Sequence, residues 1–151
     1  MRVLLDTNLL VAVVQPTHVH HAVSRSAILR LQAGGHIRCI VPQNIYEFWA
    51  IATRAVKANG LDRPTATAAA DVRRAVRYFR LLPDRPAILD VWRQLVVRHN
   101  VKGRTAHDAR LVAAMLVHGV DGILTFNVAD FVQYPTIRVL DPALVAAGTV
   151  P

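Results

Sequence analysis

Short apolar runs alternate with helical patterns along this chain, and this alternation constrains the fold more than any other feature. The segments that predict strands are 2–5, 37–41, 123–125 and 137–140, and those that predict helices are 21–31, 45–58, 64–79, 87–99 and 106–118. Such alternation is typical of an α/β fold, with a central, mostly parallel sheet of about four to five strands flanked by helices on both faces. The 151 residues suit one domain, residues 1–151.

Four acidic side chains stand where these segments begin or end. Asp6 follows the first strand at once, Glu47 lies in the helix after the second, and Asp130 follows the third. Asp108 opens the apolar helix 106–118, on the same face as its buried stripe. Ligands of such sheets bind at the carboxyl ends of the strands. We therefore expect these four acids to form one site.

Each acid also has a local interpretation. Asp6 suits a turn or a helix start, Glu47 suits the third position of a helix capped by Asn44, and Thr105 with Asp108 matches a capping box. These alternatives stay open at the level of sequence. The remaining acids that we assign to ordinary surface, cap or turn positions are Asp62, Asp71, Asp84, Asp90 and Asp141.

The charge of the chain favours a nucleic-acid partner. It has 18 Lys+Arg against 10 Asp+Glu, a formal net charge of +8, and Lys57 and Lys102 are its only lysines. Guanidinium groups suit phosphate. The residues at helical spacing that predict either a track for RNA phosphates or a solvated helix face are Arg73, Arg74, Arg77 and Arg80.

The cysteine and histidine residues argue against a disulfide and against a transition-metal site. Cys39 is the lone cysteine, so neither an internal disulfide nor a cysteine-based metal site can form, and we expect it to be a small core residue. His18, His20 and His21 are clustered, but no acid accompanies them, which argues against a transition-metal site. We find no signal peptide and no apolar run long enough to cross a bilayer, and we expect a cytoplasmic protein.

Four segments in this order resemble the PIN domain family. They are Val3-Leu4-Leu5-Asp6-Thr7-Asn8, Glu47 after the second strand, 108–114 (DARLVAA) and 123–131 (ILTFNVADF). The resemblance runs from residue 3 to about residue 140, and the compact length is similar to that of the VapC-type toxins. It implies a Mg²⁺- or Mn²⁺-dependent endoribonuclease that acts as the toxin of a toxin–antitoxin pair. RNA as substrate, a cognate antitoxin and a homodimer are the implied partners.

The resemblance also assigns the site residues. The first three acids of the family fall on Asp6, Glu47 and Asp108, and the fourth on Asp130, or on Asp130 together with Asn127, because this chain has Asn127 where many members have Asp. Thr7 and Asn8 match the small polar positions that orient the first carboxylate.

Clustered carboxylates suit phosphodiester hydrolysis for an independent reason. Hard cations held by carboxylates activate an attacking oxygen and stabilise the charge that builds on the phosphate. Two other functions remain open. One is a basic RNA-binding module without catalysis, and the other is a phosphatase with Asp6 as nucleophile, which lacks the usual Asp-x-Asp arrangement because position 8 is Asn.

Overall fold

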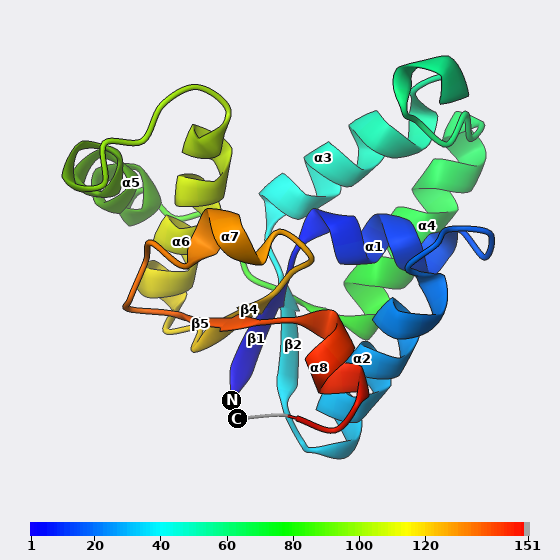
Figure 1. Cartoon of the computed structure of the whole chain (residues 1–151). Helices are drawn as coiled ribbons and strands as arrows, with labels where there is room; N and C mark the ends of the chain where they lie inside the picture. Colours follow the sequence, from blue (N-terminus) through cyan, green and yellow to red (C-terminus); the bar gives the residue numbers. More distant parts are fainter. Residues whose placement is uncertain (150–151) are drawn as a thin grey trace.

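All strands of the protein lie in one parallel sheet (Figure 1). The computed structural model describes residues 1–149. The strands are β1 (Arg2–Leu5), β2 (Ile37–Ile40), β3 (Arg80–Leu81), β4 (Gly122–Leu124) and β5 (Arg138–Leu140), in the order β3-β2-β1-β4-β5. Every neighbouring pair is parallel, and Leu4 of β1 is in register with Cys39 on one side and Ile123 on the other. The predicted α/β fold is confirmed.

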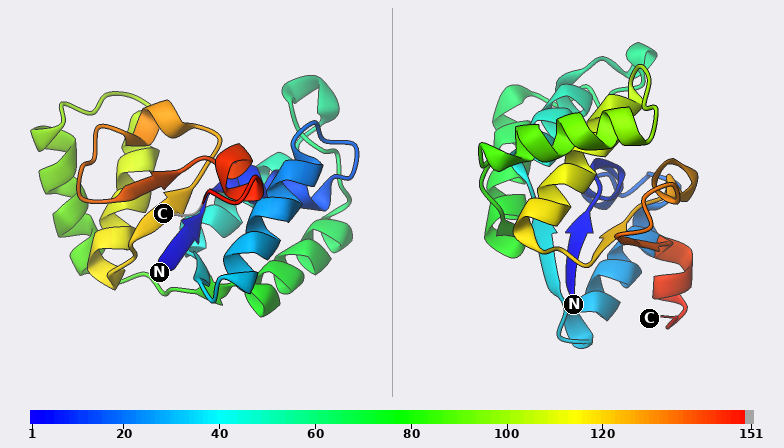
Figure 2. Two further views of the ribbon diagram at one scale, coloured as in Figure 1. Left: turned by 60° about the horizontal axis from the view of Figure 1, so that its bottom comes forward. Right: turned by 90° about the vertical axis from the view of Figure 1, so that its left-hand side faces the viewer.

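Helices cover both faces of this sheet. They are α1 (Thr7–Val14), α2 (His21–Ala33), α3 (Pro42–Thr53), the 3-10 helix η1 (Val56–Ala58), α4 (Thr65–Tyr78), α5 (Ala87–Arg98), α6 (Thr105–His118), α7 (Val128–Phe131) and α8 (Pro142–Ala146). Helices α5 and α6 lie on one side of the strands, and α1, α2, α4 and α8 on the other (Figures 1 and 2). Within residues 1–149, no helix combines the length and apolarity needed to cross a membrane.

The central strand β1 is buried on both faces, which explains its unbroken apolar sequence. Leu4 packs into the core beneath α5 and α6, whereas Val3 and Leu5 pack into the core on the opposite face, and all three are fully buried. Burial of each such side chain contributes about 2 kcal/mol. Cys39 of β2 is fully buried in the first of these cores, as expected for a small core residue.

Helix α3 differs from the sequence-based expectation. It begins at Pro42 and ends at Thr53, not at 45–58, because proline suits the first turn of a helix and the Asn44 side-chain oxygen accepts a hydrogen bond from the Val41 N–H at 2.9 Å. The chain then forms η1, which ends at Asn59 in the left-handed region at φ 59°. Glu47 therefore lies inside α3, and its interpretation as a helix-start acid is wrong.

Several short elements escaped the sequence analysis. Helix α1 directly follows Asp6 and is buried along most of its length, so its apolar run has little helical contrast. Strand β3 has 2 residues, α7 has 4 and α8 has 5, which is too short for a periodic signal. Arg80 lies in β3, so it does not continue the helical spacing of Arg73 and Arg77 on α4.

Asp71 corrects another expectation, because it is not a surface residue. Its side chain is 3% exposed, and its carboxylate lies 2.9 Å from Arg63 and 3.2 Å from Arg74. Arg63 also donates to the backbone oxygen of Val14, at the end of α1. This charge cluster ties the middle of α4 to the chain before it and to α1.

The buried ion pair between Arg63 and Asp71 predicts a large loss of stability when Asp71 is neutralised. We expect Asp71→Asn to lower the free energy of unfolding by about 3 kcal/mol, because Arg63 would keep a charge in a largely buried position. The control is Asp84→Asn, whose side chain is 45% exposed where it meets Arg110, and which should cost less than about 1 kcal/mol. Urea denaturation measures both, and equal losses would contradict a structural role of Asp71.

Candidate active site

The four predicted acids come from elements that meet at one edge of the sheet, where the parallel strands end (Figure 1). Asp6 follows β1 and is the N-cap of α1, and Glu47 lies in α3, which follows β2. Asp108 lies in the first turn of α6, and Asp130 in α7, which follows β4. The fold thus brings together acids that are up to about 120 residues apart in sequence.

Asp6 is the most firmly held of these carboxylates. It is 7% exposed. Its Oδ1 accepts a hydrogen bond from the Thr7 N–H at 2.6 Å, and its Oδ2 accepts from Asn8 Nδ2 at 2.8 Å and from Thr125 Oγ1 at 2.5 Å. Burial raises the pKa of Asp6 above its usual value, and the hydrogen bond from Thr125 opposes that shift most strongly. The helix-start interpretation of Asp6 is therefore confirmed, and its role in a site stays a prediction.

Thr7 links the first acid to the second. Its backbone N–H donates to Asp6, and its hydroxyl donates to Glu47 Oε2 at 2.7 Å. The other oxygen of Glu47 accepts from Gln43 Nε2 at 2.7 Å, one turn earlier on α3. Glu47 is therefore fixed by neutral donors, and no arginine or lysine neutralises it among the residues that the structure describes.

Gln43 joins the two sides of the site. Besides Glu47, its amide donates to the backbone oxygen of His107 at 2.9 Å, and its oxygen accepts from Arg110 Nη1 at 3.0 Å. Arg110 in turn donates to Asp84 at 2.9 Å. These bonds connect α3 to the first turns of α6, so the spacing between Glu47 and Asp108 is set by a side-chain network and not only by packing.

Asp108 is the acid whose pKa reports the other three. Its pKa is raised to about 6, first by desolvation and then by the charges of Asp130, Asp6 and Glu47. The alternative capping-box interpretation is wrong, because α6 has no side-chain cap and the Thr105 hydroxyl donates to the backbone oxygen of Lys102 at 2.8 Å. Asp108 is thus within electrostatic reach of all three other acids.

The fourth position contains two candidate side chains. Asn127 precedes α7 and is exposed, and its backbone N–H donates to Thr125 Oγ1 at 3.0 Å. Asp130 lies one turn later, and its charge raises the pKa of Asp108. This coupling favours Asp130 as the acid of the site, with Asn127 at its margin.

Within residues 1–149, none of the four acids forms an ion pair, although the chain is strongly basic. The ion pairs formed by residues 1–149 join Asp71 to Arg63 and Arg74, and Asp84 to Arg110. With 18 Lys+Arg against 10 Asp+Glu in the chain, partners are abundant elsewhere. Carboxylates that converge without an ion pair repel one another, and the charge of His107 opposes this effect at Asp108 less than the three acids produce it. Such an arrangement suits an external cation.

The donor chemistry fits a hard divalent cation. All four candidate ligands are carboxylates, and Asp6 and Glu47 are already oriented by hydrogen bonds. Within residues 1–149, no three His, Cys, Asp or Glu side chains form a ready cage for a metal ion. Mg²⁺ needs no such cage, because it usually binds through one or two carboxylates and keeps several waters or substrate oxygens.

Three participants in this network were missed by the sequence analysis: Gln43, Arg110 and Thr125. Thr125 ends an apolar strand run, so its polar hydroxyl at the sheet edge was a usable signal. No pattern in the sequence singles out Gln43 or Arg110, because their roles depend on how α3 and α6 face each other. Arg73 and Arg77 are exposed on α4, which Figure 1 shows on the far side of α1 and α3 from α6.

The raised pKa of Asp108 predicts a pH-dependent effect of its neutralisation. An acid whose pKa rises on folding, here from 3.8 to about 6, stabilises the fold at low pH and loses that contribution as pH rises through about 6. At pH 7.5 we expect Asp108→Asn to be more stable than the wild type by about 1 kcal/mol, discounted for partial solvent exposure, or about 2–4 °C in Tm.

The same substitution should change little below about pH 3, where Asp108 is protonated in both the folded and the unfolded state. Thermal unfolding followed by circular dichroism across this pH range is the measurement, with the exposed Asp90→Asn as control. A stabilisation by Asp108→Asn that does not vary with pH would contradict the electrostatic account.

Comparisons with known proteins agree with this geometry. A profile of the PIN domain family matches residues 3–135. The ribonuclease VapC24 of Mycobacterium tuberculosis is 33% identical over 82 residues, which cover 54% of this chain and 56% of that protein. The match thus spans only about half the length of this curated relative.

Solved structures share the fold at low sequence identity. The Mycobacterium tuberculosis toxin VapC20, which cleaves the sarcin–ricin loop, aligns with a TM-score of 0.67 and 20% identity over 92% of this chain and 99% of that one. VapBC2 of Rickettsia felis, solved with a promoter DNA fragment, also gives 0.67, with 12% identity over 92% of this chain and 97% of that one. With the family profile covering most of its length, the chain belongs to the PIN domain family.

Proposed function

We propose that this protein is a metal-dependent endoribonuclease that hydrolyses RNA phosphodiester bonds and acts as the toxin of a toxin–antitoxin pair. The observation that carries the proposal is the group of four converging carboxylates without basic partners, in a chain with a net charge of +8. The similarity to the ribonuclease VapC24 supports it. The positive surface would attract RNA, and the acids would supply the chemistry.

Asp6, Glu47, Asp108 and Asp130 would hold Mg²⁺ or Mn²⁺. When bound, such an ion supplies charge to polarise the scissile phosphate and to acidify water. Asn8 and Thr125 keep the Asp6 carboxylate in one orientation, and Thr7 with Gln43 does the same for Glu47. Asp130 would orient the water that attacks phosphorus, and hydrolysis adds that water across the P–O bond that breaks.

The alternative functions are supported to different degrees. A phosphatase with Asp6 as nucleophile lacks the usual second acid two residues later, because Asn8 stands there. The non-catalytic RNA-binding module is the second candidate, and the basic composition alone favours it.

Neutralising a site acid separates catalysis from RNA binding. With purified protein, bacterial RNA and Mg²⁺ or Mn²⁺, we expect Asp6→Asn and Asp108→Asn to reduce cleavage by at least about 100-fold, the scale of a lost acid–base group. EDTA should have the same effect, whereas Asp90→Asn on the exposed side of α5 should cleave normally. RNA binding should survive in both site variants, because the acids repel phosphate.

Two results would favour other functions. Binding of RNA without metal-dependent fragments in the wild type would support the non-catalytic module. Fragments that persist in EDTA and in Asp6→Asn would place the nuclease elsewhere or identify a contaminant.

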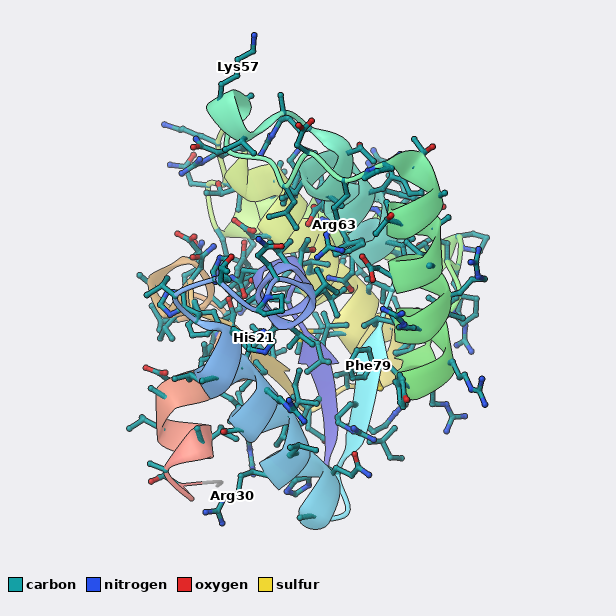
Figure 3. The ribbon with its side chains drawn as sticks, turned by 90° about the vertical axis from the view of Figure 1, so that its right-hand side faces the viewer. His21, Arg30, Lys57, Arg63 and Phe79 are labelled. Carbon is teal, nitrogen blue, oxygen red and sulfur yellow. The ribbon has the colours of Figure 1, made fainter. Side chains whose placement is uncertain are left out.

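We infer that a cognate antitoxin binds a groove between α2 and α4, where Arg63 and Phe79 lie (Figure 3). This groove has a volume of about 400 Å³ and an apolar floor that includes Leu10, Ile28 and Phe48. Arg25, Arg38 and Arg74 also line it. A segment with both apolar and acidic side chains matches this surface, and the antitoxin complexes among the similar folds support such a partner.

A homodimer in the cytoplasm completes the proposal. Tyr46 and Trp49 on α3 are 66% and 38% exposed, which is unusual for large aromatic residues and suits a protein contact. We assign them to contacts with the antitoxin or with a second copy. The reduced, buried Cys39 agrees with a cytoplasmic location.

We retain Arg73, Arg77 and Arg80 as an RNA-phosphate track, because all three are exposed. Replacing all three with Gln should reduce the slope of log K for RNA binding against log salt concentration by about 2, because each contact with single-stranded RNA contributes roughly 0.7 to that slope. The charge-matched control neutralises Arg30, Arg93 and Arg98, which are exposed on α2 and α5. Equal slopes for the two triple variants would show that these three arginines do not form a specific track for RNA phosphates.

A further inference from the structure

Three aromatic rings lie one after another in space, beside the segment that holds the Asp6 carboxylate. The rings of His20 and Phe126 are stacked, with centroids 4.2 Å apart and planes 20° apart. The ring of His18 follows, with its centroid 5.7 Å from that of His20 and its plane tilted by 46°. We call these three residues the aromatic ladder. It joins the loop between α1 and α2 to the segment between β4 and α7.

Phe126, the inner end of the ladder, is next in the chain to Thr125, which bonds to Asp6. The Thr125 hydroxyl donates to Asp6 Oδ2 at 2.5 Å. Asn127, on the other side of Phe126, donates its N–H to the same hydroxyl at 3.0 Å. A polymer whose phosphate lies at Asp6 would therefore pass its neighbouring nucleotides close to these rings.

The ladder is anchored at both ends. Phe126 is partly buried and packs against the core formed with α1, α2 and α3. On the loop side, the His20 N–H donates to His18 Nδ1 at 3.1 Å, and His21 Nδ1 bonds to the backbone oxygen of Ala12 at 2.9 Å. A platform fixed in this way loses little conformational freedom when a ligand stacks on it.

The two histidine rungs differ in exposure. His20, the middle rung, is exposed, and no side chain within residues 1–149 forms a hydrogen bond with its ring, whereas His18, the outer rung, is half-buried. Desolvation and the neighbouring charges of His20 and His21 lower the pKa of His18. A row of aromatic rings next to a group of acids suits a nucleobase better than a phosphate.

We propose that the aromatic ladder formed by His18, His20 and Phe126 is a stacking site for an unpaired base of the RNA substrate, next to the scissile phosphate. This inference rests on the proposed ribonuclease function and names what the enzyme would recognise. Stacking requires a base that is free of a duplex, because base faces within a helix are covered. The ladder therefore positions one unpaired nucleotide without reading a base edge.

The test uses a short single-stranded RNA that carries 2-aminopurine at one position at a time. Binding is measured by fluorescence to protein in the cleavage-deficient Asp6→Asn background, because 2-aminopurine is quenched when it stacks. The variants His20→Ala and His20→Phe are compared with Val19→Ala as matched control, since Val19 is 84% exposed in the same loop. Circular dichroism verifies that each variant is folded.

We expect quenching at one or two positions, which His20→Ala abolishes while weakening binding by about 5- to 10-fold. His20→Phe should retain both signals, and Val19→Ala should leave them unchanged. An abasic nucleotide at the quenched position should make His20→Ala and its parent bind equally. That combination would assign the interaction to the base.

Other results would overturn the inference. Equal binding by His20→Ala and its parent would remove the ladder from RNA recognition. A loss by His20→Ala that persists with abasic RNA, or that His20→Phe shares, would indicate a contact with phosphate. If the wild type cleaves RNA in Mg²⁺ and these results are found, only the ladder fails, whereas a wild type that neither binds nor cleaves RNA overturns the proposed function as well.

Discussion

The structure depends on how the Asp6 carboxylate is held. Its oxygens accept hydrogen bonds from Thr7, Asn8 and Thr125, which belong to the start of α1 and to the end of β4. A buried carboxylate is tolerated only when hydrogen bonds or a counter-charge compensate its desolvation. The chain after β1 must therefore lie beside the chain after β4, where these donors are. The same bonds orient the acid at the carboxyl edge of the sheet. Folding and the preparation of the site are thus one event.

Asp108 shows that the site is arranged at a cost to stability. In a core designed for stability alone it would be paired with a cation, yet its pKa is raised to about 6 by burial and by like charges. Arg110, two residues later on α6, bonds to Asp84 and Gln43 instead. Strain of this kind is typical of functional sites, and a divalent cation is the simplest means of relieving it.

The sequence predicted the parts of the fold that depend on local pattern. The long strands and helices followed from apolar periodicity, and Asp6, Glu47, Asp108 and Asp130 were selected because acids rarely adjoin buried segments. The elements with 2 to 5 residues were missed because they are too short to show a period. Glu47 was placed near a helix start because the predicted helix began at residue 45, whereas α3 begins at Pro42.

Sequence patterns could not predict interactions between residues that lie far apart in the chain. Asp71 was assigned to the surface because nothing near it in sequence shows that Arg63 would meet it in a buried position. Gln43 and Arg110, which are 67 positions apart, bond only because α3 and α6 face each other across the sheet edge. The stacking of His20 on Phe126 likewise exists only in the folded chain.

The most direct test of the central claim is the effect of Mg²⁺ on thermal stability at pH 7.5. Relief of carboxylate repulsion predicts that Mg²⁺ at about ten times its Kd stabilises the wild type by about 1.4 kcal/mol, or about 3–6 °C in Tm. The Asp6→Asn/Asp108→Asn double variant should show no such rise, and KCl of equal ionic strength should not reproduce it. An unchanged Tm in the wild type, or an equal rise in the double variant, would contradict a cation site formed by these acids.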